Sequence, residues 1–112
     1  MFEYPACVNV IAITAEGQFV LVRQYRHGIG RETWEIPVGV VETTDKTPLA
    51  GAQRELLEET GFGGGEWRAL MRVSGNAVAY NNITYCLAKD VVKMVEAVDD
   101  AVSYMISYRC DS

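Results

Sequence analysis

Several features that mark other classes of protein are scarce in this sequence. The three cysteines are widely spaced and form no Cys-x-x-Cys pair. Neither a disulfide framework nor a zinc site is therefore indicated, and we expect Cys7 and Cys86 to be buried and reduced. Every apolar run is far shorter than the roughly 20 residues of a membrane-spanning helix. The first residues lack the basic and apolar regions of a signal peptide, so the expected location is the cytoplasm, without a membrane partner.

Positive charge is also scarce. Ten lysines and arginines stand against fifteen aspartates and glutamates, which gives a formal net charge of −5 at pH 7. Because a nucleic-acid scaffold usually carries a basic stripe, no nucleic-acid partner is expected, and an anionic substrate would need local cations or a metal. The single histidine, His27, has no nearby Ser, Cys or second His and is expected to lie in a loop. A chain of 112 residues, about half of them apolar, predicts a single domain over residues 1–112.

The hydrophobic pattern predicts a sheet and one helix. β-Branched and alternating segments indicate strands at residues 7–14, 18–25, 34–39, 66–73, 82–88, 91–95 and 101–108, with loops at 28–30 and 63–65. Thr47 suits the N-cap of a helix, Pro48 its first position and Gly61 the left-handed residue after its end, so the helix is predicted over Pro48–Thr60. Gly51 costs that helix about 1 kcal/mol relative to alanine, unless close packing needs the space.

The predicted helix carries three acids on one side. At about 100° per residue, Glu55, Glu58 and Glu59 share an arc of roughly 100°, and the opposite side is apolar. Such acids often form a solvated surface. Here, however, Glu55 and Glu59 repel each other at i,i+4, the helix dipole disfavours negative charge near the C-terminus, and Arg54 is the local counter-charge. The arrangement therefore favours a site for a hard divalent cation, Mg²⁺ or Mn²⁺, which prefers oxygen ligands.

The segment at residues 54–62, RELLEETGF, resembles the signature of the Nudix hydrolases, R-E-U-x-E-E-x-G-U, where U is a bulky aliphatic or aromatic residue. Residues 20–26 and 34–39 also look like the strands that precede this signature in the ADP-ribose pyrophosphatase branch of the family. The resemblance covers residues 9–88, and it implies an α/β/α sandwich on a mixed β-sheet. No helical pattern follows residue 101, which leaves open that the C-terminal helix is missing.

The resemblance further implies an enzyme, a Nudix pyrophosphohydrolase that splits the diphosphate bond of ADP-ribose or a related nucleoside diphosphate sugar by metal-activated water. Glu58 and Glu59 match the principal metal ligands, Glu55 matches a further ligand or the general base, and Arg54 matches the arginine that supports the site. The backbone carbonyl of Val38 matches a further metal ligand.

Candidate substrate contacts lie outside the helix. Phosphate and the terminal ribose would be held by Arg23, Arg26 and Glu35. The base could stack on Trp34 or Tyr80. Each has an alternative reading as a solvated or packing residue. If a loop supplies the general base, the candidates are Glu96, Asp99 and Asp100, although each of these acids also suits a solvated surface.

Three departures from the family pattern bear on these expectations. The full signature places Glu six positions after Gly and Arg eight after that Glu, whereas Arg54 stands fifteen after Gly39. Asp45 or Lys46 therefore stands where Glu is expected, and we predict an altered loop geometry. Ala77 stands where ADP-ribose enzymes commonly have a proline. Without a C-terminal helix, an apolar sheet face would be exposed, which predicts a homodimer.

Two other functions remain open at this point. One is a housecleaning hydrolase of nucleoside triphosphates or dinucleoside polyphosphates. The other is a Nudix-fold module that binds a nucleotide without hydrolysing it. Retention of all three helix acids, Glu55, Glu58 and Glu59, argues for an enzyme.

Overall fold

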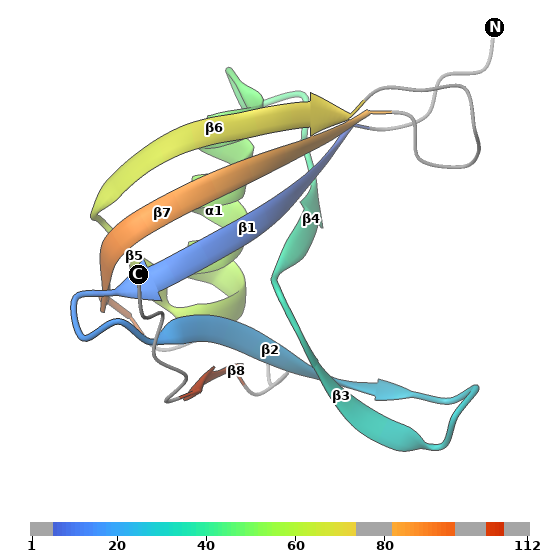
Figure 1. Ribbon diagram of the computed structural model, residues 1–112. Helices are drawn as coiled ribbons and strands as arrows, with labels where there is room; N and C mark the ends of the chain where they lie inside the picture. Colours follow the sequence, from blue (N-terminus) through green and yellow to red (C-terminus); the bar gives the residue numbers. More distant parts are fainter. Residues whose placement is uncertain (1–5, 74–81, 96–102, 107–112) are drawn as a thin grey trace, which may run out of the picture.

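A mixed β-sheet carries a helix on one of its faces (Figure 1). The structure is a computed structural model and describes residues 6–73, 82–95 and, as backbone, 103–106; residues 25 and 26 are likewise described as backbone alone. The strands are β1 (Cys7–Thr14), β2 (Phe19–Arg26), β3 (Arg31–Glu35), β4 (Val38–Val40), β5 (Phe62–Gly63), β6 (Glu66–Val73), β7 (Ile83–Lys93) and β8 (Ser103–Ile106), and the helix is α1 (Pro48–Thr60).

The strand order in the sheet is β3-β2-β1-β7-β5, with β4 also paired to β1, β6 to β7 and β8 to β2. The β1 and β7 strands are parallel, and the other pairs among the described strands are antiparallel. A parallel pair needs a long crossover, and α1 lies within the chain that connects these two strands. The predicted α/β class with a mixed sheet is confirmed. The second helical layer of a sandwich is not among the described residues.

The ends of α1 are those predicted. The backbone N–H of Ala50 donates to the Thr47 side-chain oxygen at 3.1 Å, and Pro48 occupies the first turn. Gly61 has a φ of 78° and donates its N–H to the Leu57 carbonyl at 2.9 Å. The helix therefore starts and stops on local signals, which places its acids at a fixed position along the chain.

The core lies between α1 and one face of the sheet. Val8 and Val10 on β1 are fully buried, and Cys86 and Ala88 on β7 lie beside them. From α1, Leu56 is fully buried in the same cluster. Both described cysteines are buried, as predicted, and burial raises the pKa of the Cys86 thiol. This packing holds the apolar side of α1 against the sheet and leaves its acidic side facing outward.

Three predictions about the strands were wrong. Residues 34–39 were expected to form one strand, but β3 ends at Glu35 and β4 begins at Val38. Residues 91–95 were expected to form a separate strand, but β7 continues through Lys93 because Asp90, with a φ of 62°, forms a bulge opposite the end of β1. Gly63 was expected in a loop, but it pairs with Val92 in β5. The predicted strand 101–108 is described at Ser103–Ile106, and the loop residue Ala77 and the acids of residues 96–100 lie outside the described residues.

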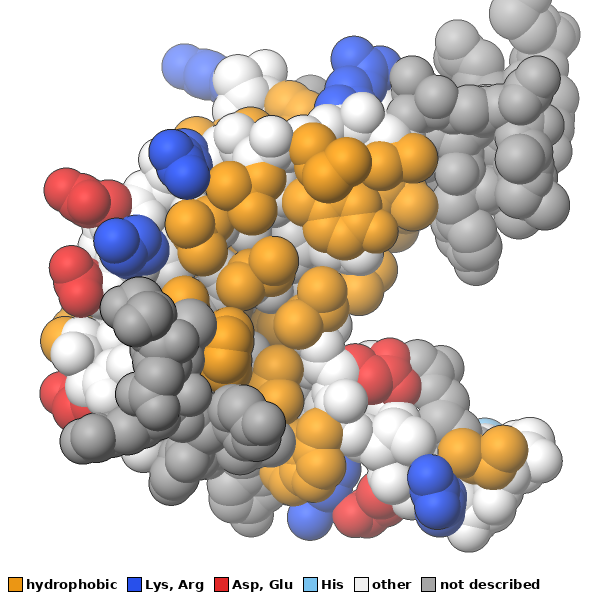
Figure 2. Space-filling view, in the orientation of Figure 1, with side chains coloured by type: hydrophobic (Ala, Val, Ile, Leu, Met, Phe, Trp, Pro, Cys, Tyr) orange, Lys and Arg blue, Asp and Glu red, His pale blue; other side chains and the backbone are white. Residues whose placement is uncertain are grey.

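The sheet face away from α1 is apolar. Figure 2 shows hydrophobic side chains gathered over β6, β7 and β1 on this face. Strand alternation places Ile11 and Leu87 here, next to each other in register, with Tyr85 and Met71 paired beyond them. The helix that the structure describes lies on the opposite face, so this patch is exposed in the described part of the chain. None of the described residues belongs to a helix that could cross a lipid bilayer.

Candidate metal centre

Arg54 connects the acids of α1 with the loop that precedes the helix. Its Nη1 donates to Glu55 Oε1 at 2.9 Å and to Glu58 Oε1 at 3.3 Å. Its Nε and Nη2 donate to the two carboxylate oxygens of Asp45 at 3.1 and 3.0 Å. The hydrogen bond to Asp45, followed by that to Glu55, holds the pKa of Arg54 above its ordinary value, against the opposing effect of burial. The charged guanidinium thus hydrogen-bonds three carboxylates, and it lies 3.7 Å from a fourth, that of Glu42.

Asp45 is the carboxylate of the preceding loop that pairs with Arg54. Asp45 Oδ2 accepts the Glu42 backbone N–H at 2.8 Å, and the Asp45 N–H donates to the Glu42 carbonyl at 3.0 Å. The hydrogen bonds from Arg54 and from the backbone of Glu42 lower the pKa of the Asp45 carboxyl. Of the two candidates, Asp45 and not Lys46 thus pairs with the arginine. Because Asp45 stands six positions after Gly39, the extra residue lies between Asp45 and Arg54.

Two glycines leave space for carboxylates. A Cβ on Gly39, in β4, would overlap the Glu55 side chain, and a Cβ on Gly51 would lie 2.9 Å from Asp45 Oδ2. Gly51 is therefore explained by close packing, the condition that the sequence left open. The roles of Gly39 and Gly51 did not follow from the sequence, because both depend on how the loop folds over the helix. The signal that was present is a glycine inside an otherwise regular helix.

The three helix acids differ in exposure. The Glu55 side chain is 17% exposed and the Glu58 side chain 49% exposed, while Glu59 is half-buried. Within residues 6–73 and 82–95, no three Asp, Glu, His or Cys side chains converge on one point as a preformed metal centre. Instead, Arg54 binds oxygens of Glu55 and Glu58. The donor set of carboxylates nevertheless fits Mg²⁺ or Mn²⁺, and the space beside Gly39 accommodates Glu55 against β4, where Val38 also lies.

The structure brings two of the predicted substrate contacts together, but not to the acids of α1. Arg23 and Trp34 face each other across β2 and β3, with the guanidinium 5.9 Å from the ring centroid, and Arg23 also pairs with Glu32 at 3.5 Å. Trp34 is 42% exposed. Glu35 accepts a 2.6 Å hydrogen bond from the Thr33 hydroxyl. In the described part of the chain β3 lies out of contact with α1, on a hairpin that extends from the body of the sheet (Figure 1).

Other predicted site residues are not described as side chains. Arg26 is placed as backbone, in register with Arg31 at the end of the β2–β3 hairpin. Tyr80 and the loop acids Glu96, Asp99 and Asp100 lie outside the described residues. His27 lies exposed in the turn between β2 and β3, which agrees with the loop position predicted for it.

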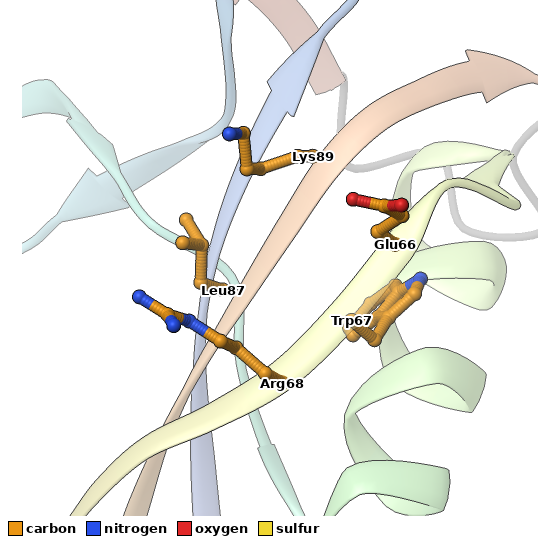
Figure 3. A pocket seen from close by; sticks show the side chains of 5 residues that line it. All are labelled: Glu66, Trp67, Arg68, Leu87 and Lys89. Carbon is orange, nitrogen blue, oxygen red and sulfur yellow. The ribbon is translucent and has the colours of Figure 1, made fainter.

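A cavity of about 590 Å³ lies at the paired strands β6 and β7 (Figure 3). It is lined by Glu66, Trp67, Arg68, Leu87 and Lys89. Leu87 and Lys89 alternate along β7 with the core residues Cys86 and Ala88, so the cavity opens on the uncovered apolar face. No sequence pattern indicated this cavity, and none of its lining residues contacts Arg54 in the described structure.

The fold is shared with a known class of hydrolase structures. The crystal structure of an ADP compounds hydrolase superposes with a TM-score of 0.73 at 21% sequence identity, over 93% of this chain and 56% of that chain. The family model for the NUDIX domain matches residues 3–101. The chain therefore belongs to the NUDIX domain family, as the signature in α1 predicted.

Curated relatives extend well beyond the region of similarity. An ADP-ribose pyrophosphatase of Mycobacterium tuberculosis is 36% identical over 69 residues, which are 62% of this chain and 33% of that protein. A methanol dehydrogenase activator of Bacillus methanolicus is 46% identical over 60 residues, 54% of this chain and 32% of that protein. The similarity thus spans about a third of the length of these curated relatives.

Proposed function

We propose that this chain hydrolyses the diphosphate bond of ADP-ribose or a related nucleoside diphosphate sugar with the help of Mg²⁺ or Mn²⁺. The observation that carries the proposal is the pair Glu55 and Glu58, held side by side by Arg54 on the helix that bears the family signature. The substrate class is supported by two proteins similar to this chain, the ADP-ribose pyrophosphatase of M. tuberculosis and the ADP compounds hydrolase. The name of the B. methanolicus relative specifies no substrate, so the tests should cover several nucleotides.

Each residue of the centre has a proposed role. Glu55, Glu58 and Glu59 would hold the cation, together with the backbone carbonyl of Val38. When bound, the cation would neutralise the diphosphate and lower the pKa of a water molecule. Arg54 would keep the carboxylates close together against their mutual repulsion. Glu55, which is less exposed than Glu58, would accept the proton of the attacking water at a carboxylate oxygen.

The proposed reaction consumes one water. The water oxygen bonds to one phosphorus, the bond from that phosphorus to the bridging oxygen breaks, and two phosphomonoesters form. The exposed, Arg23-stacked ring of Trp34 supports a contact with the nucleotide base, and Arg23 would contact phosphate or ribose. Arg26, Glu35 and Tyr80 stay predictions for the same role, as do Glu96, Asp99 and Asp100 for a base supplied by a loop.

Turnover should be measured on a panel of nucleotides with Mg²⁺ or Mn²⁺, by quantifying released phosphomonoester. We expect ADP-ribose to yield AMP and ribose 5-phosphate, EDTA to abolish the reaction, and added Mn²⁺ to restore it, because the acidic helix would otherwise repel the diphosphate. Turnover of triphosphates or dinucleoside polyphosphates with ADP-ribose left intact would favour the housecleaning hydrolase. Binding of ADP-ribose without turnover of any nucleotide would favour the binding module.

The uncovered apolar face supports the predicted homodimer, which is tested separately. Met71 lies on this face and Met94 lies beside Gly63 near α1, and both side chains are 57% exposed. If two copies meet through the apolar face, Met71→Lys should place a charge in the interface and yield monomers, whereas Met94→Lys should leave the dimer intact. Light scattering after size exclusion gives the mass of each. A monomeric wild-type chain at micromolar concentration contradicts the dimer.

A further inference from the structure

The contacts of Arg54 divide its guanidinium into two parts. The inner part, Nε and Nη2, binds Asp45 through both oxygens and the Val40 carbonyl at 3.0 Å. The outer nitrogen, Nη1, faces Glu55 and Glu58. The Asp45 side chain is 7% exposed, whereas that of Glu58 is 49% exposed. Asp45 thus fixes Nε and Nη2 of the arginine, and a single nitrogen, Nη1, is directed at the proposed metal ligands.

We propose that Asp45, in the space left by Gly51, is a positioning residue that sets the metal affinity of Glu55 and Glu58 by restraining Arg54. This inference rests on the proposed function, since it concerns the same carboxylates. Asp45 and Gly51 would then affect metal binding, in addition to the hydrogen bonds that Asp45 makes with Glu42 within the loop.

The physical reason is competition for the same oxygens. A cation bound by Glu55 and Glu58 would have to displace Arg54 from them. While Asp45 holds Nε and Nη2 in a two-bond pair, Arg54 can offer each of these glutamates only Nη1, and its charge is already balanced. Without the charge of Asp45, the guanidinium is free to turn and form its own two-bond pair with a helix carboxylate. Metal binding would then have to break that stronger pair.

Gly51 provides a way to disturb this restraint without changing any charge. Asp45 Oδ2 is held by the Glu42 N–H at 2.8 Å and by Arg54 Nη2 at 3.0 Å, and a Cβ at residue 51 would lie 2.9 Å from it. That contact is too short for a carbon and an oxygen, so Gly51→Ala must move the carboxylate. The displaced carboxylate would then restrain Arg54 less well, a smaller disturbance than the loss of charge in Asp45→Asn, although the side chain of residue 51 does not reach the arginine.

The test is the affinity of the full chain for Mn²⁺, measured by electron paramagnetic resonance without nucleotide. Asp45→Asn should weaken Mn²⁺ binding about tenfold or more, the effect typical of residues that orient metal ligands, and Gly51→Ala should weaken it by a smaller factor. Glu42→Gln is the matched control, because it removes one negative charge that lies 3.7 Å from Arg54 but is 58% exposed. It should change the affinity less than about twofold, as expected for an exposed ion pair. The double variant should be no weaker than the weaker single variant.

Thermal unfolding of the metal-free variants provides a second readout. Gly51→Ala should lower the melting temperature by a few degrees in the wild-type chain. In an Asp45→Ala background it should raise the melting temperature, because the carboxylate is gone and alanine favours a helix. This change of sign can be measured even if metal binding is weak in every variant.

The outcomes separate the two proposals. Wild-type protein that binds no Mn²⁺ overturns the proposed metal centre and this inference with it. Wild-type binding that is unchanged in Asp45→Asn and Gly51→Ala overturns the inference alone, as does a loss in Glu42→Gln equal to that in Asp45→Asn. A Gly51→Ala variant that is stabilised with Asp45 present overturns the assigned use of the Gly51 space.

Discussion

Replacement of Glu58 or Glu59 by glutamine is expected to lower kcat for ADP-ribose by about a hundredfold or more, comparable to the loss of one group that stabilises charge in a transition state. The neutral amide is a poor ligand for Mg²⁺ or Mn²⁺, so the carboxylate charge at the proposed centre is lost. The fold should survive, because Glu58 is 49% exposed and meets Arg54 at 3.3 Å, a type of pair worth at most about 1 kcal/mol.

Turnover at saturating Mn²⁺ and circular dichroism of each variant provide the measurement. Glu16→Gln is a suitable control, since it makes the same chemical change at an exposed position in the turn between β1 and β2. It should leave kcat and the melting temperature unchanged. Near-wild-type activity in both Glu58→Gln and Glu59→Gln would show that α1 does not hold the metal, whatever the substrate.

The helix could be predicted from the sequence because its signals are local. Thr47, Pro48 and Gly61 fix its ends within a few residues of chain, and the spacing of the glutamates then places them on one side. The sheet could be predicted less fully, because the parallel pairing of β1 with β7 joins residues 76 positions apart in the sequence, as in Val10 opposite Cys86. The continuation of β7 past Asp90 also depends on that partner strand.

The same distinction between local and long-range features applies to the site. Arg54 and the three acids lie within six residues, and periodicity alone predicted that the acids share a side of the helix. The pairing of Asp45 with Arg54 and the space beside Gly39 depend on the path of the loop over α1, for which the sequence has no periodic signal.

Gly61→Ala is expected to destabilise the fold by about 3 kcal/mol or more, from two separate causes. Gly61 has a φ of 78°, where an alanine side chain is strained. A Cβ there would also run into the backbone carbonyl of Val95, which cannot rotate away as a side chain could. The Gly61 carbonyl accepts N–H groups from Met94 at 2.7 Å and Val95 at 3.1 Å, so relief of the clash would break the attachment of this segment to the end of α1.

Gly17→Ala separates these causes. Gly17 has a similar φ of 83°, but a Cβ there would meet no atom within 4 Å. It should therefore lose only the conformational term, about 1 to 2 kcal/mol, and urea unfolding of both variants measures the difference. An equal loss in the two would mean that Gly61 is needed for its backbone conformation alone. A larger loss at Gly61 would show that the glycine also permits the chain after β7 to pack against the end of α1, two residues beyond Glu59, and so links the stability of the sheet edge to the position of the acids.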